Sequence, residues 1–218
     1  MAYKALDCHY SITGSGPAIF LTHGIGAAKD AWRFIVPKLS ENFTVIAYDL
    51  RGHGKSPVTH KNFGLDELVL DLERIREKTN INKGHFVGHS LGGMIAPAYA
   101  KKYPDKVLSV GMLSTVAGRS EDDSKKVWSV INEMEEKGIE KTLQKLTSRW
   151  FTDEFIANNS ELVKKRLNQV VDTDPDVFLN VFKIYAKTEM FPWLKDLSKP
   201  CLLMTCLLYT SPSPRDRG

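Results

Sequence analysis

Ser90 is the residue whose surroundings most clearly indicate chemistry. It lies at the centre of the pentapeptide GHSLG, residues 88–92, directly after the apolar segment HFV at 85–87. A serine held at a sharp turn between a strand and a helix presents its hydroxyl clear of the sheet. Glycines two residues before and after it allow the strand and the helix to approach closely. The pattern therefore predicts that Ser90 is a catalytic nucleophile.

Backbone amides near Ser90 are the groups expected to stabilise charge. Attack of a serine hydroxyl on a carboxylic ester or lactone creates an oxyanion, which preorganised N–H groups can bind. Leu91 offers one such amide at the predicted start of a helix, where the helix dipole also favours negative charge. The turn HGIG at 23–26 follows the apolar segment PAIFLT and offers a second. We assign this second donor to Ile25, with Gly24 as the alternative.

Short apolar segments alternate with helical patterns in the first half of the chain. Strands are expected at 17–22, 43–50, 85–89 and 106–115, and helices are expected from Asp30, after Gly64 and from about 94 to 103. Strands of this length alternating with helices imply crossover connections and a mostly parallel sheet with helices on both faces. The fold class is therefore α/β, with one sizeable core.

The strand signal disappears between 116 and 190. Helices are expected at about 123–137, at 160–171 and after Asp174-Pro175. An all-helical insertion between strands of one sheet indicates a lid. The expected organisation is a core at 1–115, a helical lid at 116–190, and a return to the core at 191–205.

Three motifs, LTHGIG, YDLRGHGKS and GHFVGHSLGG, occur in this order. Together they resemble the α/β-hydrolase superfamily, and the resemblance covers residues 3–205. It implies the α/β-hydrolase fold and a triad in the chain order serine, acid, histidine. Within it, the tetrapeptide RWFT at 149–152 resembles the enol-lactonase branch, whose members open 3-oxoadipate enol-lactone, although carboxylesterases and C–C bond hydrolases share the other motifs. The resemblance implies that Trp150 and Phe151, with Arg149, shape the substrate pocket.

The rest of the triad has no match in this sequence. None of the six histidines, at 9, 23, 53, 60, 85 and 89, follows Ser90. We expect His23 to brace the turn at 23–26, and Arg51 and His53 to shape the loop after Asp49. The family's acid would follow Thr205, so the triad acid and histidine are predicted to be absent from this chain. Asp122 and Asp123 are the alternative acids, and we expect them instead at the solvated start of a lid helix.

The segment CLLYTSPSPRD at 206–216 has no place in the hydrolase pattern and resembles a translated sequencing adapter. We therefore expect 206–218 to be a non-native tail and the genuine sequence to break off at Thr205, before the last strand and helix. A natural disordered terminus rich in Ser, Pro and Arg is the alternative. Because a missing strand leaves an open edge, we expect the literal 218-residue chain to fold poorly. Because the triad base is missing, we also expect it to be nearly inactive.

Composition and charge argue against several other classes of partner and cofactor. A formal charge of +4, spread among acids, indicates no nucleic-acid partner. No apolar run approaches the roughly 20 residues that span a bilayer, and no signal peptide is apparent. The three cysteines fit neither a disulfide framework nor a metal site, and no phosphate-binding glycine loop occurs, so no metal and no cofactor is predicted. We expect a cytoplasmic location.

The function predicted for the complete parent protein is a serine hydrolase. It would act on a small carboxylic ester or lactone through an acyl-serine intermediate at Ser90. Because a fold does not determine a function, a non-catalytic ligand-binding protein or receptor is the alternative. Transferase or peroxidase-like chemistry at the same serine is a third hypothesis.

Overall fold

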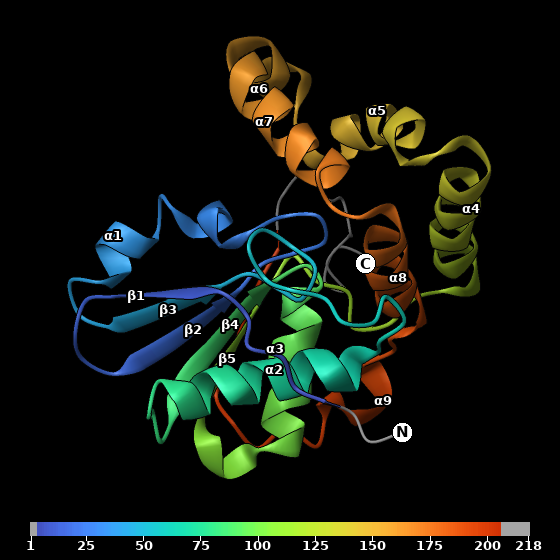
Figure 1. Ribbon diagram of the computed structural model, residues 1–218. Coiled ribbons are helices and arrows are strands. Elements are labelled where there is room, and N and C mark those ends of the chain that lie inside the picture. Colours follow the sequence, from blue (N-terminus) through green and yellow to red (C-terminus); the bar gives the residue numbers. More distant parts are fainter. Residues whose placement is uncertain (1–3, 206–218) are drawn as a thin grey trace, which may run out of the picture.

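The computed structural model describes residues 4–205, except for the side chains of 144, 145 and 149 (Figure 1). Six strands form one sheet in the order β1-β3-β2-β4-β5-β6. Their bounds are β1 Tyr10–Thr13, β2 Ala18–Thr22, β3 Thr44–Tyr48, β4 Gly84–His89, β5 Val107–Leu113 and β6 Cys201–Met204. Strand β1 runs antiparallel to β3, and every other neighbouring pair is parallel. The predicted mostly parallel sheet is confirmed.

The two faces of the sheet are covered by different helices (Figure 1). Helices α2 (Leu65–Lys78), α3 (Gly92–Lys102) and α9 (Phe191–Leu194) lie on one face. The 3-10 turn η1 (Lys29–Trp32) and helix α1 (Val36–Leu39) lie on the other. A second 3-10 turn, η2 (Pro104–Lys106), leads into β5. The helix expected from Asp30 is thus replaced by η1 and a short α1, because Pro37 can begin a helix but cannot continue one from before it.

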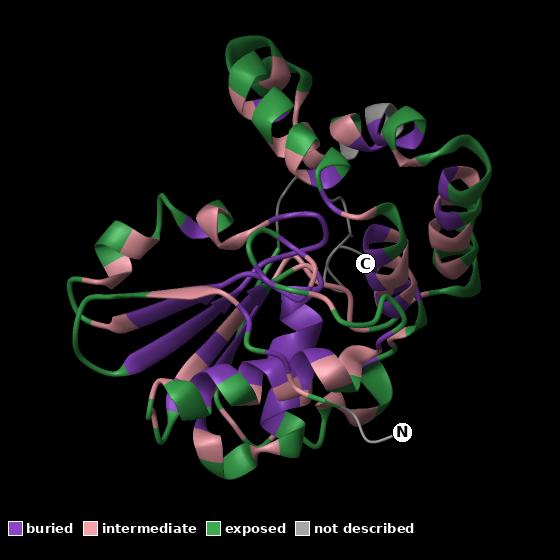
Figure 2. Cartoon of the chain, viewed as in Figure 1, coloured by how far each residue is buried: buried purple, intermediate pink, exposed green. Residues whose placement is uncertain are grey.

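Helix α3, which follows Ser90, is the most deeply buried helix of the sheet layer, as Figure 2 shows. Its residues Met94, Ile95 and Tyr99 are fully buried. The Tyr99 ring stacks on Phe86 of β4 with ring centroids 4.3 Å apart, and Phe86 stacks on Phe20 of β2. This packing holds α3 against the two strands that carry the site.

Five helices precede α9 in the connection from β5 to β6. They are α4 (Glu121–Lys137), α5 (Ile139–Trp150), α6 (Asp153–Asn158), α7 (Ser160–Val171) and α8 (Pro175–Lys187). Helices α4, α7 and α8 were expected from the sequence, whereas α5 and α6 were not. We call the segment at 116–190 the lid. Within residues 4–205, no helix combines the length and the apolar character needed to cross a membrane.

Candidate active site

Ser90 occupies a tight turn between β4 and α3. Its φ is +54°, in the left-handed region that residues other than glycine rarely adopt. The flanking glycines are required by the close approach of strand and helix. A Cβ at Gly88 would overlap the carbonyl oxygen of Gly92, and a Cβ at Gly92 would overlap the carbonyl oxygen of Thr22. The strained turn that the GHSLG motif predicts is therefore present.

Two hydrogen bonds tie this turn to the end of β5. The Ser90 N–H donates to the carbonyl oxygen of Leu113 at 2.9 Å, and the Thr115 hydroxyl donates to the carbonyl oxygen of Ser90 at 2.8 Å. Both backbone groups of the strained residue are thus satisfied by one neighbouring segment. Sequence reasoning missed Thr115, because nothing local in the sequence shows a bond across 25 residues.

Residues 23–26, which we call the oxyanion turn, follow β2 and lie against Ser90. A Cβ placed on Gly24 would be 3.1 Å from the Ser90 Cβ and 3.2 Å from Nδ1 of His89. Both side chains therefore approach this turn. Neighbouring side chains point to opposite sides only along an extended strand. At Ser90 the backbone leaves that conformation, with a φ of +54°.

The carbonyl groups of the oxyanion turn are held from several directions. The Gly24 carbonyl accepts hydrogen bonds from Nδ1 of His23 at 2.8 Å and from the Ala27 N–H at 3.3 Å. The Gly26 N–H donates to Nε2 of His53 at 3.2 Å. The bracing role predicted for His23 agrees with these contacts. His53, which was expected to shape the loop after Asp49, also bonds to this turn.

The Ile25 and Leu91 amides make no hydrogen bond within the described part of the chain. Ile25 is 9% exposed and Leu91 is fully buried, so both amides belong to buried residues. Buried backbone N–H groups are nearly always paired, which makes an unpaired one a sign of a ligand or reaction partner. The Gly24 amide is also unpaired, so the hydrogen bonds leave both Ile25 and its alternative Gly24 available.

His23 and His53 are fully buried neighbours with ring centroids 5.4 Å apart. The Leu50 N–H donates to Nε2 of His23, and Nδ1 of His53 lies 3.0 Å from the Arg51 carbonyl oxygen. In both rings Nδ1 therefore carries the proton and Nε2 accepts. Burial lowers the pKa of His23 to about 3 and the pKa of His53 to about 4. Both rings are neutral acceptors at neutral pH.

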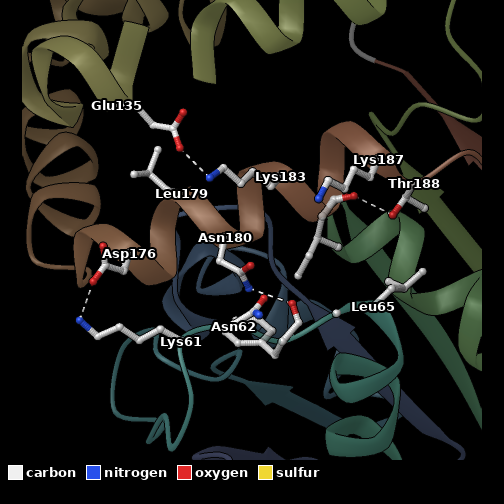
Figure 3. Close-up of a pocket in the computed structure, with 13 residues that line it drawn as sticks. Lys61, Asn62, Leu65, Glu135, Asp176, Leu179, Asn180, Lys183, Lys187 and Thr188 are labelled. Carbon is white, nitrogen blue, oxygen red and sulfur yellow. Dashed lines mark hydrogen bonds and ion pairs between the residues drawn. The ribbon is translucent and has the colours of Figure 1, made fainter. Parts of the chain in front are cut away.

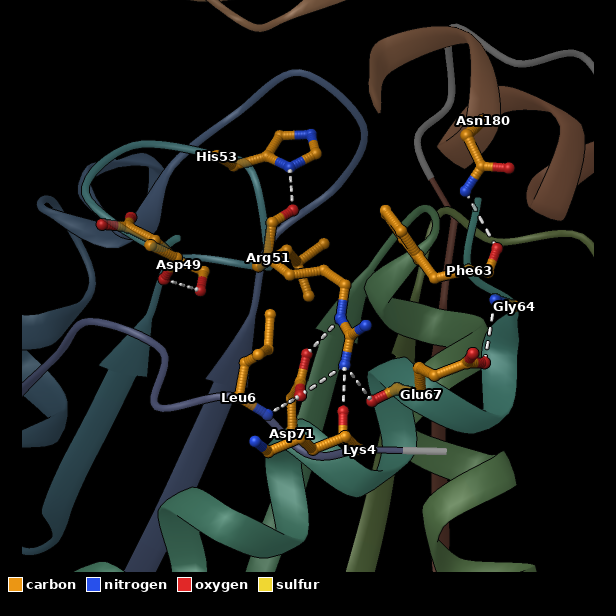
Figure 4. A network of polar contacts seen from close by, with 12 residues as sticks. Lys4, Leu6, Asp49, Arg51, His53, Phe63, Gly64, Glu67, Asp71 and Asn180 are labelled. Carbon is orange, nitrogen blue, oxygen red and sulfur yellow. Dashed lines mark hydrogen bonds and ion pairs between the residues drawn. The ribbon is translucent and has the colours of Figure 1, made fainter. Parts of the chain in front are cut away.

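A buried ion pair anchors the loop after β3, as Figure 4 shows. The Arg51 guanidinium donates two hydrogen bonds of 2.7 Å to the Asp71 carboxylate of α2. It also donates to the carbonyl oxygens of Lys4 and Glu67, each at 3.3 Å. Because this pair holds the loop that carries His53, Arg51 acts on loop shape, as the sequence predicts.

Arg166 of α7 reaches the oxyanion turn from the lid. It donates to the carbonyl oxygen of Gly26 at 2.6 Å and to that of Ile25 at 2.9 Å. Its guanidinium also lies 4.9 Å from the ring centroid of Trp150. Trp150 is thus connected to the turn through Arg166. The sequence analysis did not single out Arg166, because its partners lie about 140 residues earlier.

Phe151 and Arg149 are less directly connected to Ser90. The Phe151 ring stacks on Phe155 within the lid, with centroids 5.3 Å apart. The Arg149 side chain lies outside the described part of the structure, as does the segment 206–218. The pocket role of Trp150 and Phe151 therefore stays a prediction.

An open cleft of about 660 Å³ lies between α8, α4 and the loop at 61–65 (Figure 3). Four of its charged side chains form two pairs, since Lys183 bonds to Glu135 at 2.6 Å and Lys61 contacts Asp176 at 2.9 Å. Ser90 does not line this cleft. The cleft therefore gives no support for a role in chemistry at Ser90.

The described residues supply no convincing base for Ser90. Loss of hydration and the positive charge of Arg166 lower the pKa of His89. Within residues 4–205, however, the hydrogen bonds of Ser90 are made by its backbone N–H and carbonyl oxygen, and none joins its hydroxyl to a histidine or a carboxylate. Asp122 and Asp123 are exposed in the first turn of α4, and Ser120 caps that helix through the Asp123 N–H. They lie at a solvated helix start, as expected.

Comparison with known proteins finds a family profile and several characterised proteins that this chain resembles. A profile of the alpha/beta hydrolase fold matches residues 17–202. The 3-oxoadipate enol-lactonase 1 of Acinetobacter baylyi is 28% identical over 202 residues, which cover 92% of this chain and 74% of the relative. The 3-oxoadipate enol-lactonase 2 of the same organism is 25% identical over 189 residues, covering 86% and 70%.

Solved structures show the same architecture. The enol-lactonase from Burkholderia xenovorans LB400 matches with a TM-score of 0.84 at 23% identity, covering 94% of this chain and 80% of that one. A thermophilic esterase from Thermogutta terrifontis matches with a TM-score of 0.80 at 23% identity, covering 91% and 74%. At this level of identity the likeness establishes the shared fold.

Proposed function

The chain belongs to the α/β-hydrolase family, and on that premise we propose that it is a serine hydrolase that cleaves a small carboxylic ester or lactone. The observation that carries the proposal is the strained Ser90, which is followed by Leu91 and lies against the turn that contains Ile25. The amides of Ile25 and Leu91 make no hydrogen bond within residues 4–205. The similarity to 3-oxoadipate enol-lactonases, at 28% and 25% identity, supports an ester or lactone carbonyl as the target.

The proposed reaction has two steps. The Ser90 oxygen attacks the carbonyl carbon, and its proton passes through a base to the leaving alkoxide. The acyl-serine formed is then attacked by water, which releases the acid and returns the proton to Ser90. In both steps the negative oxygen would lie between the Ile25 and Leu91 N–H groups. Removing one such donor typically costs a factor of 10² to 10³ in turnover, about 3 kcal/mol.

The proposal needs an acid and a histidine that the described chain does not supply after Ser90. The α/β-hydrolase chain order serine, acid, histidine is therefore not completed within residues 4–205. We further propose a cytoplasmic location, since the described cysteines, Cys8 and Cys201, are both unpaired thiols.

The deciding experiment uses the product of the complete native gene. Mixed with a p-nitrophenyl ester, it should release a burst of nitrophenol equal to the enzyme concentration, as acyl-Ser90 accumulates. Ser90→Ala should abolish the burst and lower turnover by about 10⁶. Ser114→Ala is a matched control, since Ser114 also has a positive φ, +46°, but lies outside the GHSLG motif.

Two outcomes would reject the proposal. Equal turnover by the Ser90→Ala variant would show that another group attacks the ester. Saturable binding of small esters without any turnover by the complete protein would favour the alternative of a ligand-binding protein or receptor.

A further inference from the structure

Arg166 differs from the other well-packed arginines in its partners. Each of those pairs with a carboxylate: Arg51 with Asp71 at 2.7 Å, Arg76 with Glu73 at 2.7 Å, and Arg119 with Glu189 at 3.0 Å. No described carboxylate lies within ion-pair distance of Arg166. Loss of hydration lowers its pKa to about 10, so it remains charged at neutral pH. Its polar partners are the two carbonyl oxygens of the oxyanion turn.

Peptide planarity explains what these two bonds do. A carbonyl group and the N–H of the next residue share one rigid plane, so holding one end orients the other. The plane joining Gly24 to Ile25 is held by His23 at its carbonyl, and this plane carries the Ile25 N–H. The plane joining Ile25 to Gly26 is held by Arg166 at the oxygen and by His53 at the N–H. Arg166 also holds the carbonyl of the next plane.

Three successive planes of the turn are therefore fixed, and the lid contributes to two of them through one side chain. Gly26 has a φ of +61°, and a Cβ there would lie 2.7 Å from Phe178 and 2.9 Å from Val170, both on lid helices. The lid thus packs on the same residue whose carbonyl Arg166 binds. With Arg166 withdrawn, two carbonyl groups would lose their charged donor, and the plane that follows the one carrying the Ile25 N–H would keep only its bond to His53.

We propose that Arg166 is a positioning residue, through which the docked lid sets the orientation of the oxyanion turn. The inference rests on the proposed function, since it concerns the donor that would bind the oxyanion. If Arg166 has this role, the turn can bind the oxyanion only while the lid is docked against it. A lid that only covered the substrate would affect substrate binding and leave the turn unchanged.

The first test replaces Arg166 by Gln in the complete protein, with Arg119→Gln as the matched control. Arg119 also donates to two carbonyl oxygens, those of Thr188 and Tyr185, and lies over an aromatic ring, but it does not contact the turn. Arg166→Gln should lower kcat for an activated ester by about 10- to 100-fold with KM changed less than about threefold. It should weaken binding of a boronic acid, which mimics the tetrahedral state, by the same factor. Arg119→Gln should change kcat by less than about twofold.

The second test asks for rescue by the missing group. Guanidinium ion at millimolar concentration should restore turnover of Arg166→Ala in a saturable way and should leave Arg119→Ala unaffected. Should both Arg166→Gln and Arg166→Ala fail to fold, Arg166→Lys decides the matter. An ammonium group cannot span two carbonyl groups as a guanidinium does, so kcat should fall by about three- to tenfold in a folded protein.

The outcomes separate this inference from the function on which it rests. If Ser90→Ala abolishes turnover while a folded Arg166 variant keeps the kcat of the wild type, the positioning role is wrong and the hydrolase proposal stands. If the Arg166 variants raise KM and leave both kcat and boronic acid affinity unchanged, Arg166 acts on substrate binding and the inference is also overturned. If Ser90→Ala keeps full turnover, the hydrolase proposal itself fails.

Discussion

The carboxyl ends of β2 and β4 and the edge strand β6 are held in very different ways. The turns after β2 and β4 are fixed by bonds from β5, from the loop after β3 and from the lid. Strand β6 pairs only with β5 within the described residues, and its Leu202, Leu203 and Met204 are 55%, 69% and 59% exposed. The two turns beside Ser90 are therefore held by hydrogen bonds from three other segments, whereas strand β6 of the same sheet exposes apolar side chains.

The two regions of the sheet therefore have different requirements: one must hold a strained residue in place, and the other must only pair with its neighbouring strand. A strained Ser90 persists only where its surroundings determine its conformation several times over. Strand β6 carries no such strain and needs only its pairing with β5. Substitutions at the braced end should therefore cost both stability and activity, whereas substitutions at the edge should mainly change association between molecules.

The largest effect is expected at Gly92. Gly92→Ala would place a Cβ against the backbone of Thr22, which cannot move without disturbing β2, and should lower the free energy of unfolding by at least about 3 kcal/mol. Gly64→Ala is the control, because the nearest atom to its Cβ would be a Glu67 carboxylate oxygen at 3.4 Å. It should cost less than about 1 kcal/mol. Urea denaturation of the complete protein measures both, and equal losses would contradict the close packing described at the elbow.

A smaller effect is expected from acid. Because burial lowers the pKa of His23 and His53, these two histidines bind protons in the unfolded chain at pH values where they remain unprotonated in the folded chain. Their contribution to stability is therefore complete above the unfolded pKa of about 6.5 and is lost as the pH falls toward 4. Each neutral histidine contributes a slope approaching about 1.4 kcal/mol per pH unit below 6.5.

His53→Gln keeps an acceptor for the Gly26 N–H without a titrating ring. It should therefore reduce the dependence of the free energy of unfolding on pH, between pH 6.5 and 5, by the contribution of one histidine. His60→Gln, which removes a histidine at an exposed site, is the control. Urea denaturation at several pH values provides the measurement. An unaltered slope in His53→Gln would mean that the ring does not stay neutral in the folded protein.

The smallest effect on stability is expected at the edge. Leu203→Lys should change the free energy of unfolding by less than about 0.5 kcal/mol, because the side chain is 69% exposed. It should nevertheless reduce association of the 218-residue chain, since charge on an exposed edge strand opposes pairing with another molecule. Phe34→Lys, at a site 73% exposed but away from the sheet edge, is the control. Equal light scattering by both variants would show that the molecules do not associate through β6.

The sequence predicted the central strands and Ser90 well because each depends on local residues. Strands β2 and β3 are short apolar segments, and the elbow is defined by five consecutive residues. Helix α5 was missed although its buried Leu143 and Leu146 have helical spacing, so a closer reading of that spacing would have found it. Strand β1 was missed because its sequence YSIT is short and half polar.

The contacts that complete the site could not be predicted from the sequence. Thr115 and Arg166 look like ordinary polar residues, and their importance arises only when distant segments meet. His89 shows a different limit. Alternation along a strand holds only while the backbone remains extended, and the motif that identifies Ser90 is also the place where extension ends.

The contact between Arg166 and the turn at 25–26 has a consequence for how a newly made molecule becomes active. The two ends of this contact are 140 and 141 residues apart, so the ribosome finishes the serine and its turn long before it makes the arginine. At roughly 5 to 20 residues per second, that delay is on the order of ten seconds. A nascent chain would carry the turn throughout this interval, and Ser90 for its last 76 residues, without the clamp that completes the turn. The proposed hydrolysis would therefore begin only late in biosynthesis.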